Sequence, residues 1–241
     1  MDNLEEIMIK ENVANVLAEV REICQQTGRS QNEITIVAVT KTVGSEEANS
    51  LLEYGMCNLG ENRAEGLMGK YKELGRNAKW HFIGSLQSNK VRDIIDIVDY
   101  IHSLDRISLA EEIQKRASKM VKCFVEIKTS SEPSKQGIDV NNAVDFIQSL
   151  QPYDKIQVIG LMTMAPLTSD ANEIRSCFKA LRILQKQIQR LQISHAPCSE
   201  LSMGMSNDYK IAIQEGATFI RLGSILFGRR EAELTNSPLT S

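Results

Sequence analysis

The chain has 241 residues, and its formal net charge of -3 gives no basic footprint for nucleic acid. Hydrophobic residues make up 42% and charged residues 24%, which is typical of a soluble globular protein, and no apolar run approaches membrane-spanning length. The N-terminus M-D-N-L-E-E lacks the basic start and apolar core of a signal peptide. The five cysteines are scattered without a CxxC pair, as expected in a reducing compartment. We therefore expect a cytoplasmic protein with neither a nucleic acid nor a membrane as partner.

Apolar residues recur at helical spacing over residues 4–27, and Gly28 is placed to end the helix. From residue 34 onward, strand-like and helix-like segments alternate. The predicted strands are 34–40, 56–59, 80–84, 99–103, 122–127, 156–163, 197–202 and 218–222. The predicted helices between and after them are 45–54, 62–74, 89–97, 106–119, 140–150, 170–192, 206–215 and 224–229.

This alternation predicts an α/β protein, a single (β/α)₈ TIM barrel with an extra N-terminal helix, since such barrels need about 250 residues. An open doubly wound sheet would show a glycine fingerprint after its first strand, and T-K-T-V-G is no G-x-G-x-x-G. No Pro/Gly/Ser-rich linker divides the chain. We expect one domain over residues 1–230, followed by a polar tail at 231–241.

The first strand ends in a lysine. Residues 33–41 read E-I-T-I-V-A-V-T-K, a short apolar run rich in β-branched residues that predicts a buried parallel strand. Lys41 would stand at the barrel mouth, where ligands bind. A partly desolvated lysine there can attack a carbonyl to form an imine. A solvated lysine that simply ends a strand is the alternative.

Glycine and serine follow the last two predicted strands. Barrel enzymes often bind phosphate in the loops after strands seven and eight. Gly204 and Gly223 would let the backbone approach an anion, and Ser206 and Ser224 would offer hydroxyls. Helix capping alone would also explain either serine. Two such turns at this position favour a phosphate site.

Arg221 lies between Ile220 and Leu222 within the last predicted strand. An inward arginine must meet an acceptor, which can be a ligand's ring nitrogen, a carboxylate or a neighbouring protein acid. His81 lies between Trp80 and Phe82, where a lone histidine is more commonly a satisfied core residue than a ligand contact. With three widely separated histidines, the sequence predicts neither a metal triad nor a Ser-His-Asp set.

Several blocks of sequence match one known family. They are V-A-V-T-K at 37–41, L-G-E-N at 59–62, W-H-F-I-G-S-L-Q-S-N-K at 80–90, S-K-Q-G at 134–137, G-L-M-T-M at 160–164, L-S-M-G-M-S-N-D at 201–208 and I-R-L-G-S-I-L-F-G at 220–228. With these blocks the chain resembles the YggS/PROSC family of pyridoxal 5′-phosphate (PLP) homeostasis proteins from about residue 10 to 228. The resemblance implies PLP fold type III, the barrel of alanine racemase without its second β domain.

The resemblance also implies which residues hold the cofactor. The lysine that forms the internal aldimine, a Schiff base, matches Lys41, and the pyridine-nitrogen contact matches Arg221. Asn62 matches a position near the cofactor. The phosphate contacts match Ser206, Gly223 and Ser224. Three further residues from the matching blocks complete the predicted cofactor-binding set: His81, Met162 and Met205.

Two positions depart from the family's pattern. Many members follow the lysine with Thr-Lys-Pro, whereas this chain continues Thr42-Val43-Gly44. The family usually shows a Val/Ile-Asn pair before S-K-Q-G, and here Ile127 is followed by Lys128. The second departure removes a polar contact that the fifth strand would otherwise offer.

The predicted function is that of a PLP carrier or regulator in vitamin B6 and amino-acid homeostasis, and not that of an efficient enzyme. An arginine at the ring nitrogen opposes its protonation and weakens PLP as an electron sink. Racemisation also needs acid/base groups on both faces of the substrate, and the sequence offers no second group opposite Lys41. We expect a monomer, with apo PLP enzymes as candidate acceptors. The alternatives are a PLP-dependent amino-acid racemase-like enzyme and a PLP-independent phosphate-binding barrel enzyme.

Overall fold

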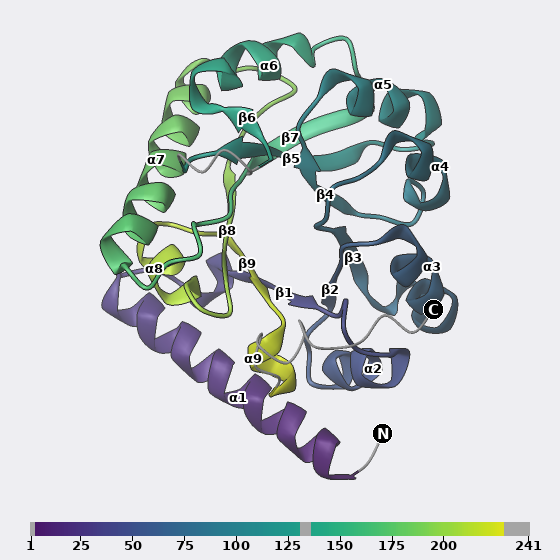
Figure 1. Ribbon diagram of the computed structural model, residues 1–241, viewed down its shortest axis with the longest axis vertical. Coiled ribbons are helices and arrows are strands. Elements are labelled where there is room, and N and C mark those ends of the chain that lie inside the picture. The colour runs from purple at the N-terminus through teal and green to yellow at the C-terminus, as the bar shows by residue number, and fades with distance from the viewer. Residues whose placement is uncertain (1–2, 131–135, 229–241) are drawn as a thin grey trace.

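Parallel strands form the centre of the computed structural model, which describes residues 3–130 and 136–228 (Figure 1). Around the barrel the strands run β4-β3-β2-β1-β9-β8-β7-β5, and a β4–β5 pairing closes the ring. Their bounds are Thr35–Val39 (β1), Asn58–Glu61 (β2), Lys79–Phe82 (β3), Tyr100–Leu104 (β4), Val121–Lys128 (β5), Ile156–Met162 (β7), Glu200–Met205 (β8) and Phe219–Leu222 (β9). The predicted closed barrel is confirmed. A short strand outside the ring, β6 (Ile138–Asp139), pairs with β5 and was not predicted.

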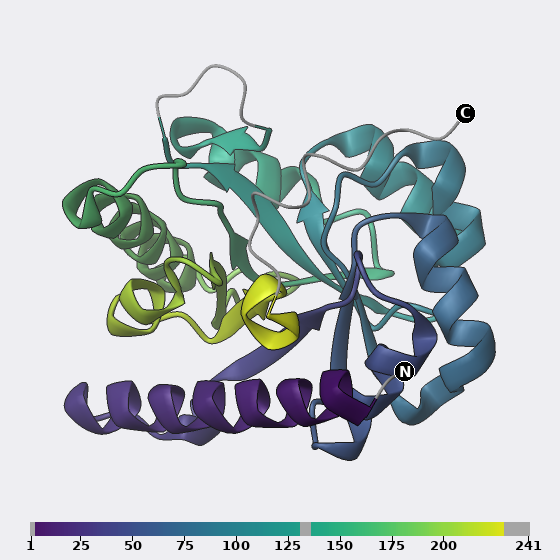
Figure 2. The same ribbon diagram turned by 60° about the horizontal axis from the view of Figure 1, so that its bottom comes forward.

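Helices surround the barrel and cover its outer face (Figures 1 and 2). Their bounds are Ser45–Glu53 (α2), Ala64–Leu74 (α3), Val91–Ile94 (α4), Ile107–Arg116 (α5), Ala143–Ser149 (α6), Ala171–Arg190 (α7), Tyr209–Gln214 (α8) and Ser224–Phe227 (α9). The predicted N-terminal helix is confirmed as α1 (Asn3–Gln26), which contacts α2, α8 and α9 from outside the ring. Within the described residues, no helix is both long enough and apolar enough to cross a membrane.

Alternation along the strands separates two apolar cores. On β9, Ile220 and Leu222 belong to the large core between barrel and helices, whereas Phe219 belongs to the small core inside the barrel. Successive strand residues face opposite sides, so Arg221 shares the inner side with Phe219. The inner core consists of Val37, Phe124, Ile159, Met162 and Phe219.

The seventh predicted strand lies three residues too early, at 197–202 instead of Glu200–Met205. Pro197 cannot donate a hydrogen bond to a sheet, and Cys198 has a φ of +46°, outside the strand region. The chain therefore joins the barrel only after these residues. The predicted polar tail at 231–241, together with Ser134 and Lys135, lies outside the described residues.

A buried polar cluster joins the ends of β1 and β2. The Thr40 hydroxyl donates to Glu61 Oε1 at 2.6 Å, and Lys70 Nζ donates to the same oxygen at 2.8 Å. Glu61 is buried, so the lysine supplies the opposite charge that its carboxylate needs. The cluster fixes two strand ends from which Lys41 and Asn62 continue toward the barrel mouth.

Candidate functional site

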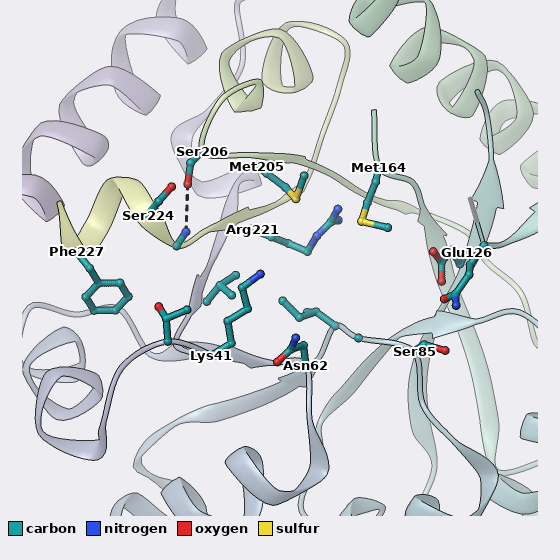
Figure 3. Close-up of a pocket in the computed structure, with 16 residues that line it drawn as sticks. Lys41, Asn62, Ser85, Glu126, Met164, Met205, Ser206, Arg221, Ser224 and Phe227 are labelled. Atoms are coloured by element: carbon teal, nitrogen blue, oxygen red, sulfur yellow. Dashed lines mark hydrogen bonds between the residues drawn. The ribbon is translucent and has the colours of Figure 1, made fainter. Parts of the chain in front are cut away.

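The carboxyl ends of the strands surround a cavity of about 260 Å³ (Figure 3). Seven of the nine predicted cofactor-binding residues line it: Lys41, Asn62, Met205, Ser206, Arg221, Gly223 and Ser224. Because the strands are parallel, their carboxyl ends meet at one face of the barrel, which brings together residues that are up to 183 positions apart (Lys41 and Ser224). The structure therefore gathers most of the predicted set in one place.

Lys41 extends into the cavity toward Arg221 (Figure 3). It follows β1 by two residues, and the buried Thr40 next to it is held by Glu61. The Lys41 side chain is exposed at the mouth of the cavity and not partly desolvated as its position after the strand suggested. The position of Lys41 is thus fixed through the preceding residue, Thr40, while its amine remains accessible to a ligand.

The two serine turns meet at one side of the cavity (Figure 3). The Ser206 hydroxyl oxygen accepts from the backbone N–H of Gly223 at 3.3 Å and of Ile225 at 3.5 Å. The turn after β8 is itself fixed, because the Asp208 carboxylate accepts from the Met205 N–H at 2.6 Å. Ser206 and Ser224 both line the cavity, and two hydroxyls brought together on turns that the backbone fixes suit a phosphate group.

The two glycines of these turns differ in role. Gly223 lines the cavity, and a Cβ there would meet Val39 only at ordinary contact distance, 3.4 Å. Gly204 does not line it; its φ is +95°, and a Cβ would lie 2.5 Å from the Cβ of Ala212 in α8. The interpretation of Gly204 as an anion-approach residue is therefore replaced by a packing role, since only glycine fits under α8 there.

The guanidinium of Arg221 is buried on the inner side of the barrel. Its Nη1 donates to Ser202 Oγ at 2.7 Å and its Nη2 to the Thr163 carbonyl oxygen at 3.1 Å. No acid within residues 3–130 and 136–228 forms a salt bridge with it. Burial lowers the pKa of Arg221 to about 10, while the negative charges of Asp208 and Glu126 oppose that shift. The side chain thus remains a cation at neutral pH.

Glu126 of β5 also lines the cavity, at the side away from the two serines, and sequence reasoning missed it (Figure 3). Burial raises the pKa of its carboxyl to about 7, with a further upward contribution from Asp105 and a downward one from Arg221. The signal was present in the alternation of V-K-C-F-V-E-I-K, where Glu126 shares a strand face with Phe124 of the inner core. The fifth strand therefore does supply a polar group, although Lys128 stands where the family usually has asparagine.

The remaining two predicted residues lie below the cavity. His81 is fully buried, with Nε2 3.1 Å from Asn58 Oδ1 and Nδ1 3.0 Å from His102 Nε2. Met162 belongs to the inner apolar core. Neither residue lines the cavity, because both side chains are buried in the barrel interior. The structure instead adds Met164, Ser85 and Phe227 to the cavity lining.

Comparisons with known proteins agree with this geometry. Residues 12–231 match the family model described as alanine racemase, N-terminal domain. A pyridoxal phosphate homeostasis protein of Aquifex aeolicus is 37% identical over 225 residues, 92% of this chain and 98% of that protein. A crystal structure of an unknown protein from Bifidobacterium adolescentis has a TM-score of 0.90 at 32% identity, covering 94% of this chain and 97% of that one.

A third relative is informative about ligands. The structure of PipY from Synechococcus elongatus, described as having PLP bound, has a TM-score of 0.80 at 31% identity and covers 91% of this chain and 100% of that one. The fold and site thus define a parallel α/β barrel of the alanine racemase N-terminal type. Within that class, the chain belongs to the pyridoxal phosphate homeostasis family.

The buried carboxyl of Glu126 gives the stability of the ligand-free protein a dependence on pH. Its pKa in the folded state, about 7, lies above the ordinary value of 4.5, so folding favours the protonated form. Stability therefore falls as the pH rises between these two values. Relative to Glu126→Gln, we expect the wild type to lose at most about 3 kcal/mol of unfolding free energy over this range.

Urea unfolding of both proteins at a series of pH values measures this difference. The test is the change with pH in the difference between the two unfolding free energies. A difference that is constant with pH does not count, because the substitution also changes the surroundings of Arg221. If the unfolding free energies of the two proteins changed in parallel between pH 4.5 and about pH 7, the raised pKa of Glu126 would be contradicted.

Proposed function

We propose that this chain binds PLP in the cavity at the barrel mouth and acts as a carrier or regulator of PLP in vitamin B6 and amino-acid homeostasis. The observation that carries the proposal is that Lys41, the serine turns and the buried Arg221 face one small cavity. PLP needs an amine for its aldehyde, a cradle for its phosphate and a group opposite its ring nitrogen, and these residues supply one of each. The PLP described as bound to PipY, a relative 31% identical to this chain, supports the same assignment.

Each of these residues would contact a different part of the cofactor. When bound, PLP supplies an aldehyde that condenses with a primary amine. Lys41 would supply that amine, because its side chain lines the cavity and is exposed at the mouth. Ser206 and Ser224 would hold the phosphate beside Gly223, and Arg221 would face the ring nitrogen. Neither His81 nor Met162 is part of this proposed contact set.

A carrier must also release its cargo. Lys41 is exposed, so water and incoming amines could reach the nitrogen to which the cofactor would be bonded. Arg221 brings a positive charge toward the ring nitrogen and opposes its protonation, which weakens stabilisation of a substrate carbanion. Both features favour exchange of the cofactor over catalysis. We propose apo PLP enzymes as acceptors in the cytoplasm, a reducing location supported by five cysteines that form no disulfide within the part of the chain that the structure describes.

A racemase-like activity is the second candidate, and Glu126 is the observation that favours it. Its carboxyl lines the same cavity as Lys41, and its pKa of about 7 suits proton transfer near neutral pH. The sequence offered no second acid/base group, whereas the structure offers this one. We rank this activity below the carrier role because of the charge of Arg221.

The first expectation is that Lys41 carries the covalent bond to the cofactor. Borohydride reduction of the PLP-loaded protein, followed by peptide mass mapping, should place the pyridoxyl mass on Lys41. Lys90 is a useful internal comparison because it lies in a matching block and instead forms a salt bridge with Glu65 at 2.5 Å. A pyridoxyl mass on Lys90 or Lys135 would refute the assignment.

The second expectation concerns the phosphate. Ser224→Ala should remove a hydrogen bond to a charged group, worth about 1.5–3 kcal/mol, and so weaken PLP binding by at least about tenfold. Pyridoxal, which has no phosphate, should bind the variant and the wild type equally. Titration of both ligands against each protein measures the effect.

Ser85→Ala is the matched control, because Ser85 lines the opposite side of the same cavity (Figure 3). It should leave the ratio of PLP to pyridoxal affinity unchanged. If Ser224→Ala weakened both ligands equally, the serine would support the fold and not the phosphate.

The third expectation separates carrier from enzyme. Incubation of the PLP-loaded protein with L-alanine, followed by resolution of the enantiomers, should yield at most a trace of D-alanine. Sustained turnover on the order of 1–1,000 per second, as in ordinary enzymes, would establish the racemase instead. Glu126→Gln should abolish any trace if that carboxyl acts as the second proton-transfer group.

A further inference from the structure

Arg221 is one end of an unbroken series of hydrogen bonds inside the barrel. Its Nη1 lies 2.7 Å from Ser202 Oγ, and the same oxygen lies 2.8 Å from His102 Nδ1. His102 Nε2 lies 3.0 Å from His81 Nδ1, and His81 Nε2 lies 3.1 Å from Asn58 Oδ1. The series links β9, β8, β4, β3 and β2 and runs from the cavity to the opposite end of the barrel.

The two ends of the series fix the direction of every bond in it. A guanidinium can only donate, and the amide oxygen of Asn58 can only accept. A neutral imidazole carries one N–H, so His81 must donate from Nε2 and accept at Nδ1. His102 then donates from Nε2 and accepts at Nδ1, which requires Ser202 to donate its hydroxyl proton to His102. Each member donates toward Asn58.

The surroundings keep both imidazoles neutral. His81 stacks on Tyr100 with the rings 4.4 Å apart, and His102 stacks on Phe124 at the same separation. Burial lowers the pKa of His81 to about 3, with a smaller contribution from Lys79. Burial also holds the pKa of His102 well below its usual range, and His81 and Arg221 add to the effect. The positive charge at the cavity end of the series therefore belongs to Arg221 alone.

The series determines which donors Arg221 can offer to a ligand. Ser202 occupies one N–H of Nη1, and the Thr163 carbonyl occupies one N–H of Nη2. Three of the five guanidinium N–H groups are left for other acceptors. Ser202 donates its own proton to His102, so its oxygen lone pairs are left to accept from Arg221. This hydrogen bond restrains the orientation of the guanidinium.

We propose that Ser202, His102 and His81 are positioning residues, whose oriented hydrogen bonds hold Arg221 so that its remaining donors meet an acceptor ring nitrogen in the cavity. The identity of the ligand in this proposal rests on the proposed function. The order of donors and acceptors in the series is independent of it. Buried polar networks of this kind are stabilising only when every member is satisfied. Here the last acceptor, Asn58, completes the series at the barrel's lower rim.

The histidine tautomers test the series without any cofactor. The chain has three histidines, so the imidazole nitrogen signals of ¹⁵N-labelled apo protein are few, and His195→Gln identifies the third. We expect His81 and His102 to be neutral, with the proton on Nε2, throughout the range from about pH 5 to pH 8. A proton on Nδ1 of either ring, or a charged ring in this range, would overturn the proposal.

A pair of buried serines tests the positioning role. Ser202→Ala removes the link between Arg221 and His102, whereas Ser103→Ala removes the hydroxyl of a neighbouring β4 residue that has no hydrogen-bond partner among the described residues. For Ser202→Ala we expect PLP binding to weaken on the order of tenfold, because a hydrogen bond to a charged group is lost. The absorption maximum of the bound cofactor should also shift, because it reports the surroundings of the ring nitrogen. Ser103→Ala should change neither quantity.

Equal behaviour of the two serine variants would overturn the positioning role. Two substitutions at His102 extend the test: His102→Asn keeps an acceptor near the position of Nδ1, whereas His102→Leu keeps none. The asparagine variant should retain more of the wild-type spectrum, and equal losses would indicate a purely structural histidine. If the wild type itself failed to bind PLP, the proposed function would fall, and the tautomers of the apo protein would still decide the series.

Discussion

A positive charge buried inside the barrel is the constraint on which the rest of the site depends. A guanidinium without acceptors would be strongly destabilising there, so Arg221 requires partners from several strands at once. Thr163 follows β7, Ser202 belongs to β8 and, through it, His102 to β4. The polar residues in the barrel interior are therefore explained by one cation. The same charge lowers the pKa of the Glu126 carboxyl against the larger effect of burial, which raises it.

A second polar cluster holds the opposite side of the mouth. Thr40 and Lys70 both donate to the buried carboxylate of Glu61, which joins the ends of β1 and β2 to α3. Lys41 and Asn62 directly follow residues of this cluster, so their backbone positions are determined although their side chains reach the cavity. The cavity thus lies between two hydrogen-bonded polar clusters, and its lysine is exposed to an incoming ligand.

Most of the fold could be predicted because its signals are local. Eight strand-like segments, each followed by a helical pattern, were enough for the barrel, and all eight strands formed close to the expected places. The error at the seventh strand came from Pro197 and Cys198, whose backbone conformations delay entry into the sheet. The strand β6 was missed because two residues carry no periodicity.

The sequence by itself determined that strand ends would hold the site, because parallel strands place all their carboxyl ends on one face. It also predicted the lysine, the serine turns and the arginine as site residues, since each is tied to a motif at a strand end. Only the tertiary structure decided which residues reach the cavity. His81 and Met162 belong to matching motifs, yet their side chains face the interior below the mouth. Glu126 belongs to none of the matching motifs and lines the cavity, because the height of a residue along a tilted strand depends on how the strands are staggered around the barrel.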